Sequence, residues 1–226
     1  MFSFFVTLPK AFILLPATLN PASMHPIINT AYLQQGMSYQ AYRQLASRLT
    51  AEGKTSGTNQ SKDLVAYSKL NEQRMHRLDK TAQLTEQTLQ ALAKHSEPQV
   101  WVLLTEVWCG DAAQSVPYIA KIAEANPHIS LYIYLRDEHT ALMDMYLRNG
   151  GRAIPMLISI SADTFEEHWH SRARTQSTQA MVQAYKDHPQ GEFKDFVEKL
   201  HAWYTQNKGV ELQEEIVQLI SSVKAI

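Results

Sequence analysis

The sequence predicts an α/β fold, with a central mixed sheet flanked by helices, a helical extension before it and extra helices after it. Short apolar runs rich in β-branched and aromatic residues, typical of buried strands, occupy residues 100–104, 129–135 and 153–160. Helical patterns separate these runs, so the first two strands are expected to be parallel. A polar turn at 161–163 leads to a hairpin partner over 164–170. The sheet is therefore expected to have about four strands.

Apolar residues at helical spacing also fill the stretch that precedes the first strand. We predict helices over 27–33 and 39–49, with Ser38 as the N-cap of the second. After a polar loop, Ser61 caps a longer helical pattern that breaks near residues 80–85. About 70 residues of mainly helical sequence therefore come before the sheet begins.

Further helices are predicted on the carboxyl side of the first strand. One begins at Asp111, directly after the strand, and the others cover residues 137–148, 175–187, 192–206 and 210–223. The sequence Asn149-Gly150-Gly151 ends the helix before the third strand, because glycine readily adopts the left-handed conformation that closes a helix.

The first 23 residues form an apolar segment of a different character. Their only charge, Lys10, lies in the middle, and prolines interrupt the apolar run. The segment is too broken to span a membrane as a helix, and it fits a secretory signal poorly. We interpret the chain as a poorly structured or signal-like leader (1–23), a helical amino-terminal extension (24–96) and a main domain with extra carboxyl-terminal helices (97–226).

Composition excludes several classes of function. The 21 Lys and Arg residues nearly balance the 22 Asp and Glu residues and form no basic block, so we expect no nucleic-acid partner and no stable membrane insertion. The single cysteine excludes an internal disulfide and fits a reducing compartment. A cytoplasmic location is expected, and export is the alternative if residues 1–22 act as a signal peptide. His168 and His170 lack further ligands at zinc spacing, so no metal site is predicted.

The cysteine itself, Cys109, lies where the first predicted strand gives way to a helix. Unpaired backbone N–H groups and the positive end of the helix dipole favour negative charge at that point. We therefore expect the pKa of the Cys109 thiol to be lowered and the sulfur to be a nucleophile.

Two motifs resemble the signatures of the thioredoxin family. Trp108-Cys109-Gly110-Asp111-Ala112, followed by Pro117, resembles the active-site motif and its helix-kinking proline. The sequence Gly151 to Leu157 resembles the loop whose cis-proline, here Pro155, faces the active cysteine. The resemblance covers residues 98–170 and implies a thioredoxin-like fold. It also implies a substrate groove formed by the residues Trp108, Gly110, Ala112, Ile154 and Pro155, in which the backbone of Ile154 pairs with the bound partner.

The active-site motif departs from the family pattern at one decisive position. Ala112 stands where the family has its second cysteine, so no thiol of this chain could release a mixed disulfide formed at Cys109. Leu103 corresponds to the family's buried proton-accepting aspartate, and Glu106 and Asp111 are the candidates to replace it. Asp111 would also raise the pKa of the thiol by like-charge repulsion, against the helix dipole.

Three hypotheses for function follow from these motifs. The first is monothiol disulfide exchange with a partner protein or a small thiol, without a resident cofactor, in which an external low-molecular-weight thiol resolves the adduct. The second is a redox-inactive module that binds a peptide or protein in the same groove by strand addition at Ile154. The third, by analogy with monothiol glutaredoxins, is a cluster shared through Cys109 by two subunits. We interpret Arg172 and Arg174 as a solvated turn, with an acidic substrate or a cofactor carboxylate as the alternative.

Overall fold

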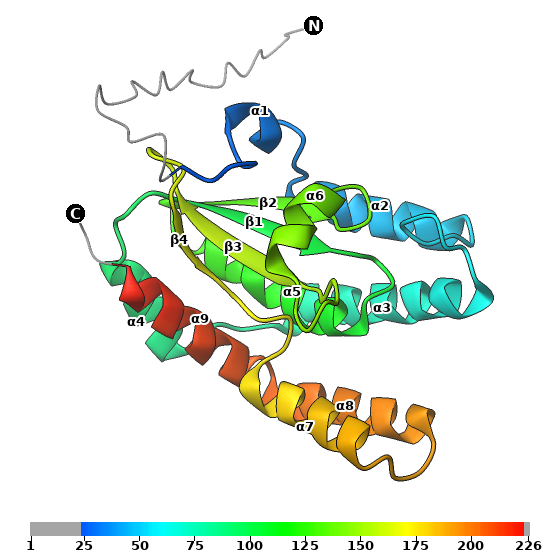
Figure 1. Cartoon of the computed structure of the whole chain (residues 1–226). Coiled ribbons are helices and arrows are strands. Elements are labelled where there is room, and N and C mark those ends of the chain that lie inside the picture. The colour runs from blue at the N-terminus through cyan, green and yellow to red at the C-terminus, as the bar shows by residue number, and fades with distance from the viewer. Residues whose placement is uncertain (1–23, 224–226) are drawn as a thin grey trace, which may run out of the picture.

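The structure, a computed structural model, describes residues 24–223, and the leader predicted over 1–23 lies outside the described residues (Figure 1). Its centre is a four-stranded mixed sheet with the strand order β2-β1-β3-β4. The strands are β1 (Gln99–Thr105), β2 (Ile129–Leu135), β3 (Met156–Ser161) and β4 (Glu167–His170). β1 pairs with β2 in parallel, and the pairs β1–β3 and β3–β4 are antiparallel. The predicted mixed sheet flanked by helices is confirmed.

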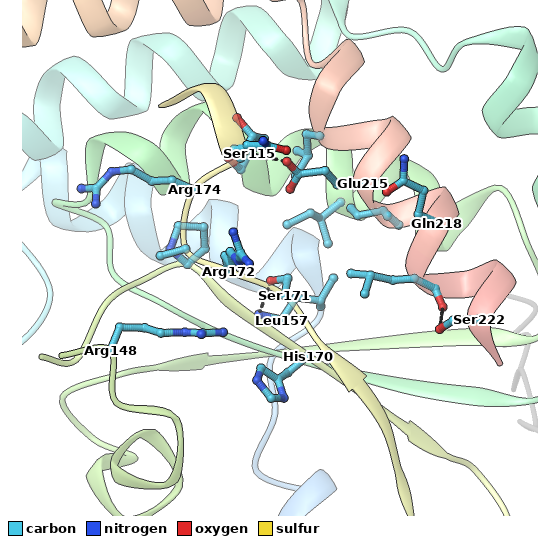
Figure 2. A pocket seen from close by; sticks show the side chains of 18 residues that line it. Ser115, Arg148, Leu157, His170, Ser171, Arg172, Arg174, Glu215, Gln218 and Ser222 are labelled. Carbon is cyan, nitrogen blue, oxygen red and sulfur yellow. Dashed lines mark hydrogen bonds between the residues drawn. The ribbon is translucent and has the colours of Figure 1, made fainter. Parts of the chain in front are cut away.

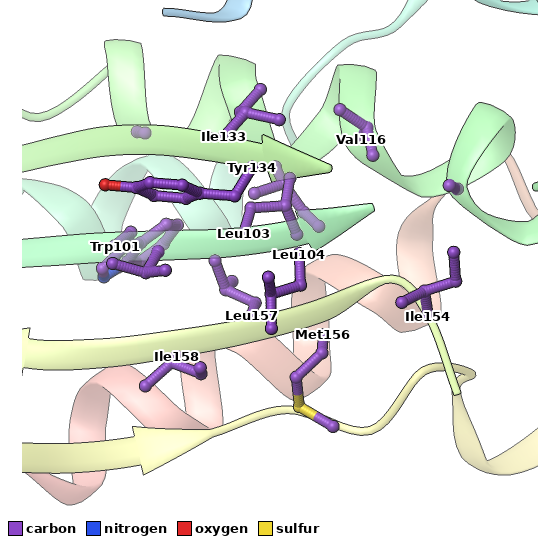
Figure 3. Packing of buried hydrophobic residues seen from close by; sticks show 14 of the residues in the cluster. Trp101, Leu103, Leu104, Val116, Ile133, Tyr134, Ile154, Met156, Leu157 and Ile158 are labelled. Carbon is purple, nitrogen blue, oxygen red and sulfur yellow. The ribbon is translucent and has the colours of Figure 1, made fainter. Parts of the chain in front are cut away.

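The middle of the sheet forms the core of the molecule. Every residue of β1 and of β3 is buried, which explains why both strands read as nearly continuous apolar runs. In the register of this pair, Val102 faces Ile158 and Leu104 faces Met156. Figure 3 shows Leu104, Met156 and Ile158 on these strands, and Val116 of the helix that follows β1 belongs to the same buried cluster. The core therefore lies directly behind the junction that holds Cys109.

Four helices precede the sheet, namely α1 (Thr30–Leu33), α2 (Tyr39–Ala51), α3 (Lys62–Thr81) and α4 (Glu86–Lys94). Ser38 and Ser61 cap α2 and α3 through their side chains, as predicted, and Thr85 caps α4. The first helix is shorter than expected, because Asn29 accepts the N–H of Tyr32 and so starts the helix at residue 30. α3 packs along the helix after β1, and α2 packs on α3 and β2.

The helix after β1, α5 (Gly110–Glu124), begins directly after Cys109 and contains Pro117. The helix predicted over 137–148 is wrong in extent, because the structure has only α6 (Thr140–Met143) and the 3-10 turn η1 (Asp144–Tyr146) there. No helix begins at residue 137. The N–H of Asp137 donates instead to the carboxylate of Glu106 at 2.8 Å. The backbone then turns at Asn149 and Gly150, both with positive φ.

The third and fourth strands start later than predicted. β3 begins at Met156 rather than at residue 153, because the peptide between Ile154 and Pro155 is cis and Pro155 has no N–H for the strand ladder. β4 begins at Glu167 rather than at 164, because Phe165 has a positive φ of 58° that interrupts the extended backbone. The hairpin between the two strands is otherwise as expected.

Three helices follow the sheet, namely α7 (Gln176–Asp187), α8 (Phe193–Asn207) and α9 (Val210–Ser222). Each begins and ends within one residue of the predicted position. Figure 1 shows α7 and α8 as a pair that extends away from the sheet, whereas α9 returns along α4. Ile216 and Ile220 of α9 belong to the main hydrophobic core. Within residues 24–223, no helix has both the length and the apolar character needed to cross a membrane.

Candidate functional site

The two motifs, far apart in the sequence, meet at the sulfur of Cys109. Cys109 is the N-cap residue of α5, and its backbone N–H donates to the carbonyl oxygen of Glu106 at 3.2 Å. The Cys109 thiol donates to the carbonyl oxygen of Ile154 at 3.4 Å, across 45 residues of sequence. That carbonyl directly precedes the cis peptide to Pro155. The strand-to-helix junction and the cis-prolyl turn thus form one site.

The thiol in this site is covered and protonated. Cys109 is 8% exposed and belongs to the hydrophobic core. Burial, and next the nearby carboxylate of Asp111, raise the pKa of the thiol to about 12. The N–H groups of Ala112 and Asp111 and the guanidinium of Arg174 act in the opposite direction, but they do not outweigh burial. The helix terminus therefore acts on this pKa in the expected direction, but burial and the charge of Asp111 outweigh it, so the net shift is upward.

Asp111, one of the two predicted proton acceptors, is engaged by partners from the carboxyl-terminal part of the chain. Its carboxylate forms an ion pair with Arg174 at 2.6 Å and accepts a hydrogen bond from the hydroxyl of Tyr204 at 2.9 Å. Burial nevertheless raises the pKa of Asp111, because it outweighs the charge of Arg174 and the two hydrogen bonds. Asp111 joins the start of α5 to α8 and to the loop before α7.

Glu106, the other predicted proton acceptor, is fully buried behind the turn that leads to Cys109. It accepts hydrogen bonds from the hydroxyl of Ser56 and from the N–H of Asp137. Ser56 in turn accepts the N–H of Val107 at 2.9 Å. Burial raises the pKa of Glu106, and the two hydrogen bonds oppose that effect. Both carboxylate oxygens thus hold loops together, and a direct role toward the sulfur stays a prediction.

The predicted groove residues lie around the sulfur in different environments. Trp108 is half-buried, and the guanidinium of Arg136 lies 4.8 Å from its ring centroid, a cation–π arrangement. Ala112 is fully buried, and Ile154 and Pro155 are buried as well. A side chain at Gly110 would meet His201, because an added Cβ would lie 3.1 Å from its ring. The imidazole of His201 therefore fills the space of the predicted groove next to Gly110.

The residues that cover the site were missed by the sequence analysis. They are Arg174, which was interpreted as part of a solvated turn, and His201 and Tyr204 of α8. The ring of His201 lies within 3.3 Å of the side-chain amide of Gln114, and burial, with a smaller effect of Arg74, lowers the pKa of His201 to about 4. His201 and Tyr204 follow their partners by 87 and 93 positions, and a local sequence pattern does not indicate pairings over such separations.

The described residues contain no group of three or more His, Cys, Asp or Glu side chains placed to hold a metal ion. The chemistry that the site offers is that of one thiol. The thiol lies beside a backbone carbonyl and a cis-proline, under a cover of polar side chains from the carboxyl-terminal helices.

Comparison with known proteins points to one family. A thioredoxin family model matches residues 57–186. Among solved structures, an HIV epitope-scaffold is 15% identical with a TM-score of 0.55, covering 87% of this chain and 100% of the scaffold. A protein of unknown function from Pseudomonas aeruginosa is 14% identical with a TM-score of 0.56, covering 86% of this chain and 98% of that protein. At such identities these structures show a shared fold alone. No curated protein matches the chain.

Proposed function

The chain belongs to the thioredoxin family, and from this premise we propose that it carries out monothiol disulfide exchange through Cys109. The observation that supports this function best is the 3.4 Å contact between the Cys109 sulfur and the carbonyl oxygen of Ile154, next to the cis peptide of Pro155. A partner chain that pairs with the backbone of Ile154 would bring its own disulfide beside that sulfur. The partner is a disulfide-containing protein or a low-molecular-weight disulfide.

The exchange needs two balanced steps. The Cys109 thiol gives its proton to water, and the thiolate attacks one sulfur of the partner disulfide, so that a Cys109–partner disulfide forms and the other partner sulfur leaves as a thiolate. Because Ala112 replaces a second cysteine, an external low-molecular-weight thiolate then attacks the partner sulfur of that adduct. The Cys109 thiolate leaves and regains a proton. The sum is an exchange of thiols on the partner, without net oxidation.

In the proposed reaction the covered thiol must first become accessible. With its pKa raised to about 12, Cys109 is almost entirely protonated at neutral pH and is a weak nucleophile in this arrangement. The contacts of Asp111 with Arg174 and Tyr204 hold the cover in place. Exchange therefore proceeds from the fraction of molecules in which these contacts have opened.

The proposal is tested by following adduct formation with the aromatic disulfide dithionitrobenzoate by intact mass spectrometry. We expect one adduct on the folded protein, released by 2-mercaptoethanol, and none on the matched variant Cys109→Ser. The rate of adduct formation should exceed the rate of global unfolding measured under the same conditions. An adduct that appears only as fast as the protein unfolds would contradict monothiol exchange.

A second candidate function is a redox-inactive binding module, which the burial and the raised pKa of Cys109 favour. The same groove would then hold an extended peptide without a covalent step. The variant Cys109→Ser separates the two functions, because a binding module keeps its noncovalent partners when the sulfur is replaced. Monothiol exchange predicts instead that partners captured from an extract as mixed disulfides disappear with the sulfur.

A further inference from the structure

A cavity with a volume of about 440 Å³ opens beside Pro155, between the sheet, α5 and α9 (Figure 2). Ser115 of α5, Leu157 of β3 and Glu215 of α9 contribute to different walls, and the loop over residues 171–175 closes another side. A volume of this size is typical of sites for small organic molecules. Cys109 is not among the lining residues, but the cavity adjoins the thiol site, because Pro155 and Arg174 border both.

Positive charge dominates the lining of this cavity. Three arginines, Arg148, Arg172 and Arg174, line it against a single carboxylate, that of Glu215. Figure 2 shows the side chain of Glu215 entering from α9 and that of Arg148 coming from a loop on the opposite side. One carboxylate oxygen of Glu215 already accepts a hydrogen bond from the N–H of Gln176 at 2.7 Å. The positive charges of the lining repel one another. An anion bound among them would be attracted to each and would reduce this repulsion.

The arginines keep hydrogen-bonding capacity for a ligand. Within residues 24–223, neither Arg148 nor Arg172 forms an ion pair with an acidic side chain. Arg174 is paired with Asp111 through one terminal nitrogen, but its Nε is buried without a hydrogen-bond partner among the described residues. Figure 2 shows the side chain of Arg174 directed away from Glu215 and Arg172, so Arg148 and Arg172 are the arginines available to a ligand.

His170 also borders the cavity, and a hydrogen-bonded chain holds its ring in place. The Nδ1 atom of His170 lies 2.7 Å from a carboxylate oxygen of Glu167, whose other oxygen accepts the hydroxyl of Tyr146 at 2.5 Å. Tyr146 lies 3.0 Å from Nε2 of the buried His25, whose Nδ1 accepts the N–H of Ile28. With Nδ1 of His170 directed at Glu167, its Nε2 is the ring nitrogen left for a ligand.

The hydroxyl of Ser171 is a further available donor. Its oxygen already accepts the N–H of Leu157 at 3.2 Å, so its own O–H is free to point toward an acceptor. From this lining we propose that the cavity binds a small organic molecule through a phosphate or carboxylate group. Guanidinium groups suit both anions, since each presents paired oxygens to the planar N–H donors.

Isothermal titration of the whole chain with pyrophosphate and, separately, with citrate tests the proposal, with sodium chloride of equal ionic strength as the reference. We expect saturable binding of one anion per chain to at least one of the two probes. Tighter binding of pyrophosphate would identify a phosphate site, and tighter binding of citrate a carboxylate site. Absence of saturable binding to both at millimolar concentration would overturn the proposal.

Matched variants locate the binding. Arg172→Gln and Arg148→Gln should each weaken it by about tenfold or more, because each removes a charge-assisted contact. Arg48→Gln removes an exposed arginine on α2, outside the cavity, and should leave the affinity unchanged. An equal loss in Arg48→Gln would show nonspecific attraction and contradict a site. Cys109→Ser should bind as the wild type does, so this experiment and the adduct test of monothiol exchange can fail independently.

Discussion

At the scale of single residues, the thiol of Cys109 shares the amino end of α5 with the carboxyl group of Asp111. Burial raises the pKa of both groups, and the charge of Asp111 further raises that of the thiol. The guanidinium of Arg174 stabilises both anions at once. A helix terminus favours negative charge, but here it is not sufficient to offset removal of the sulfur from water. The reactivity of Cys109 therefore depends on the side chains that cover it.

Replacing Asp111 by Asn should make the thiol more reactive. The substitution removes a negative neighbour and leaves the positive charge of Arg174 unpaired, and both changes favour the thiolate. We expect the rate of iodoacetamide alkylation at pH 8 to rise about tenfold, the effect of one unit of pKa. A lowered pKa shifts the pH at which the rate levels off and leaves the plateau rate unchanged, whereas a loosened cover also raises the plateau rate. Asp195→Asn, at an exposed position of α8, is the control, and a slower reaction of Asp111→Asn would contradict the assignment.

His201 should make the stability of the protein depend on pH between about 4 and 6.5. Its folded-state pKa is lowered from 6.5 to about 4, so in this range the unfolded chain binds a proton that the folded chain excludes. The stability contributed by neutral His201 is complete above pH 6.5 and is lost as the pH falls toward 4. We measure the unfolding free energy of both proteins by urea denaturation at pH 7 and at pH 5. We expect the decrease between these two pH values to be about 1–2 kcal/mol smaller in His201→Gln than in the wild type. Equal losses in both proteins would contradict the buried neutral imidazole.

The hydrogen bonds of Glu106 predict a structural effect of Ser56. Ser56→Ala removes the hydroxyl donor from a fully buried carboxyl group, so the free energy of unfolding should fall by about 1–3 kcal/mol. Ser47→Ala, at an exposed position of α2, is the control and should have little effect. If Glu106 serves the fold alone, Glu106→Gln lowers stability but leaves the rate of adduct formation unchanged. A large loss of rate without loss of stability would support Glu106 as the proton acceptor instead.

At the scale of secondary-structure elements, the pair α7 and α8 reaches the thiol site through few polar contacts. These are the ion pair of Arg174 with Asp111, the hydroxyl of Tyr204 on the same carboxylate, and the contact of His201 with Gln114. At the other end of the pair, the rings of Tyr185 and Phe196 stack with centroids 4.4 Å apart, and Phe193 is 61% exposed. The pair is thus held together by its own aromatic residues and held to the thiol site by polar contacts, while Gln176 and Ser177 of α7 also bond to Glu215 and Glu211 of α9.

Removal of one of these contacts should loosen α8 locally. Tyr204→Phe keeps the ring but deletes the donor to Asp111, so we expect faster hydrogen–deuterium exchange over residues 193–207 and a loss of about 1–2 kcal/mol in local stability. Adduct formation at Cys109 should become faster in parallel. Tyr185→Phe is the control, because its hydroxyl makes only a 3.5 Å contact with Gly191 at the surface. An unchanged rate in Tyr204→Phe, despite faster exchange of α8, would show that α8 does not control access.

At the scale of the whole molecule, one hydrophobic core unites parts that the sequence analysis separated. Ile28 and Met75 from the predicted extension belong to the same core as β1, and so do Ile216 and Ile220 of α9. Gln213 of α9 also bonds to the N–H of Thr85 at the start of α4, across 128 residues. The family match begins at residue 57, well before the first strand. The helices at both ends are thus part of the packing that supports the sheet.

A substitution in α9 tests whether the chain unfolds as one unit. Ile216→Ala shortens a side chain that is 1% exposed in the main core, so the free energy of unfolding should fall by about 2–5 kcal/mol. Circular dichroism and tryptophan fluorescence should still report one coincident transition. The control Glu214→Ala changes an exposed residue of the same helix and should have little effect. Two separate transitions in Ile216→Ala would show that α9 folds independently of the sheet.

The sequence by itself determined most of the architecture. Apolar runs predicted the strands, Ser38 and Ser61 predicted helix starts, and two motifs predicted the family and brought attention to Cys109 and Pro155. These features can be predicted from the sequence because strand alternation, helix spacing and capping depend on a few neighbouring residues. The extended helix predicted over 137–148 was wrong, because Glu106, 31 positions away, takes the N–H of Asp137.

Only the tertiary structure decided the state of the site and the character of the cavity. The pKa of Cys109 depends on its removal from water and on how Asp111 and Arg174 are placed beside it. The cavity gathers arginines from two loops with helix and strand residues that are distant in sequence. Burial and electrostatic interaction depend on distances in space, which a local pattern of residues does not contain.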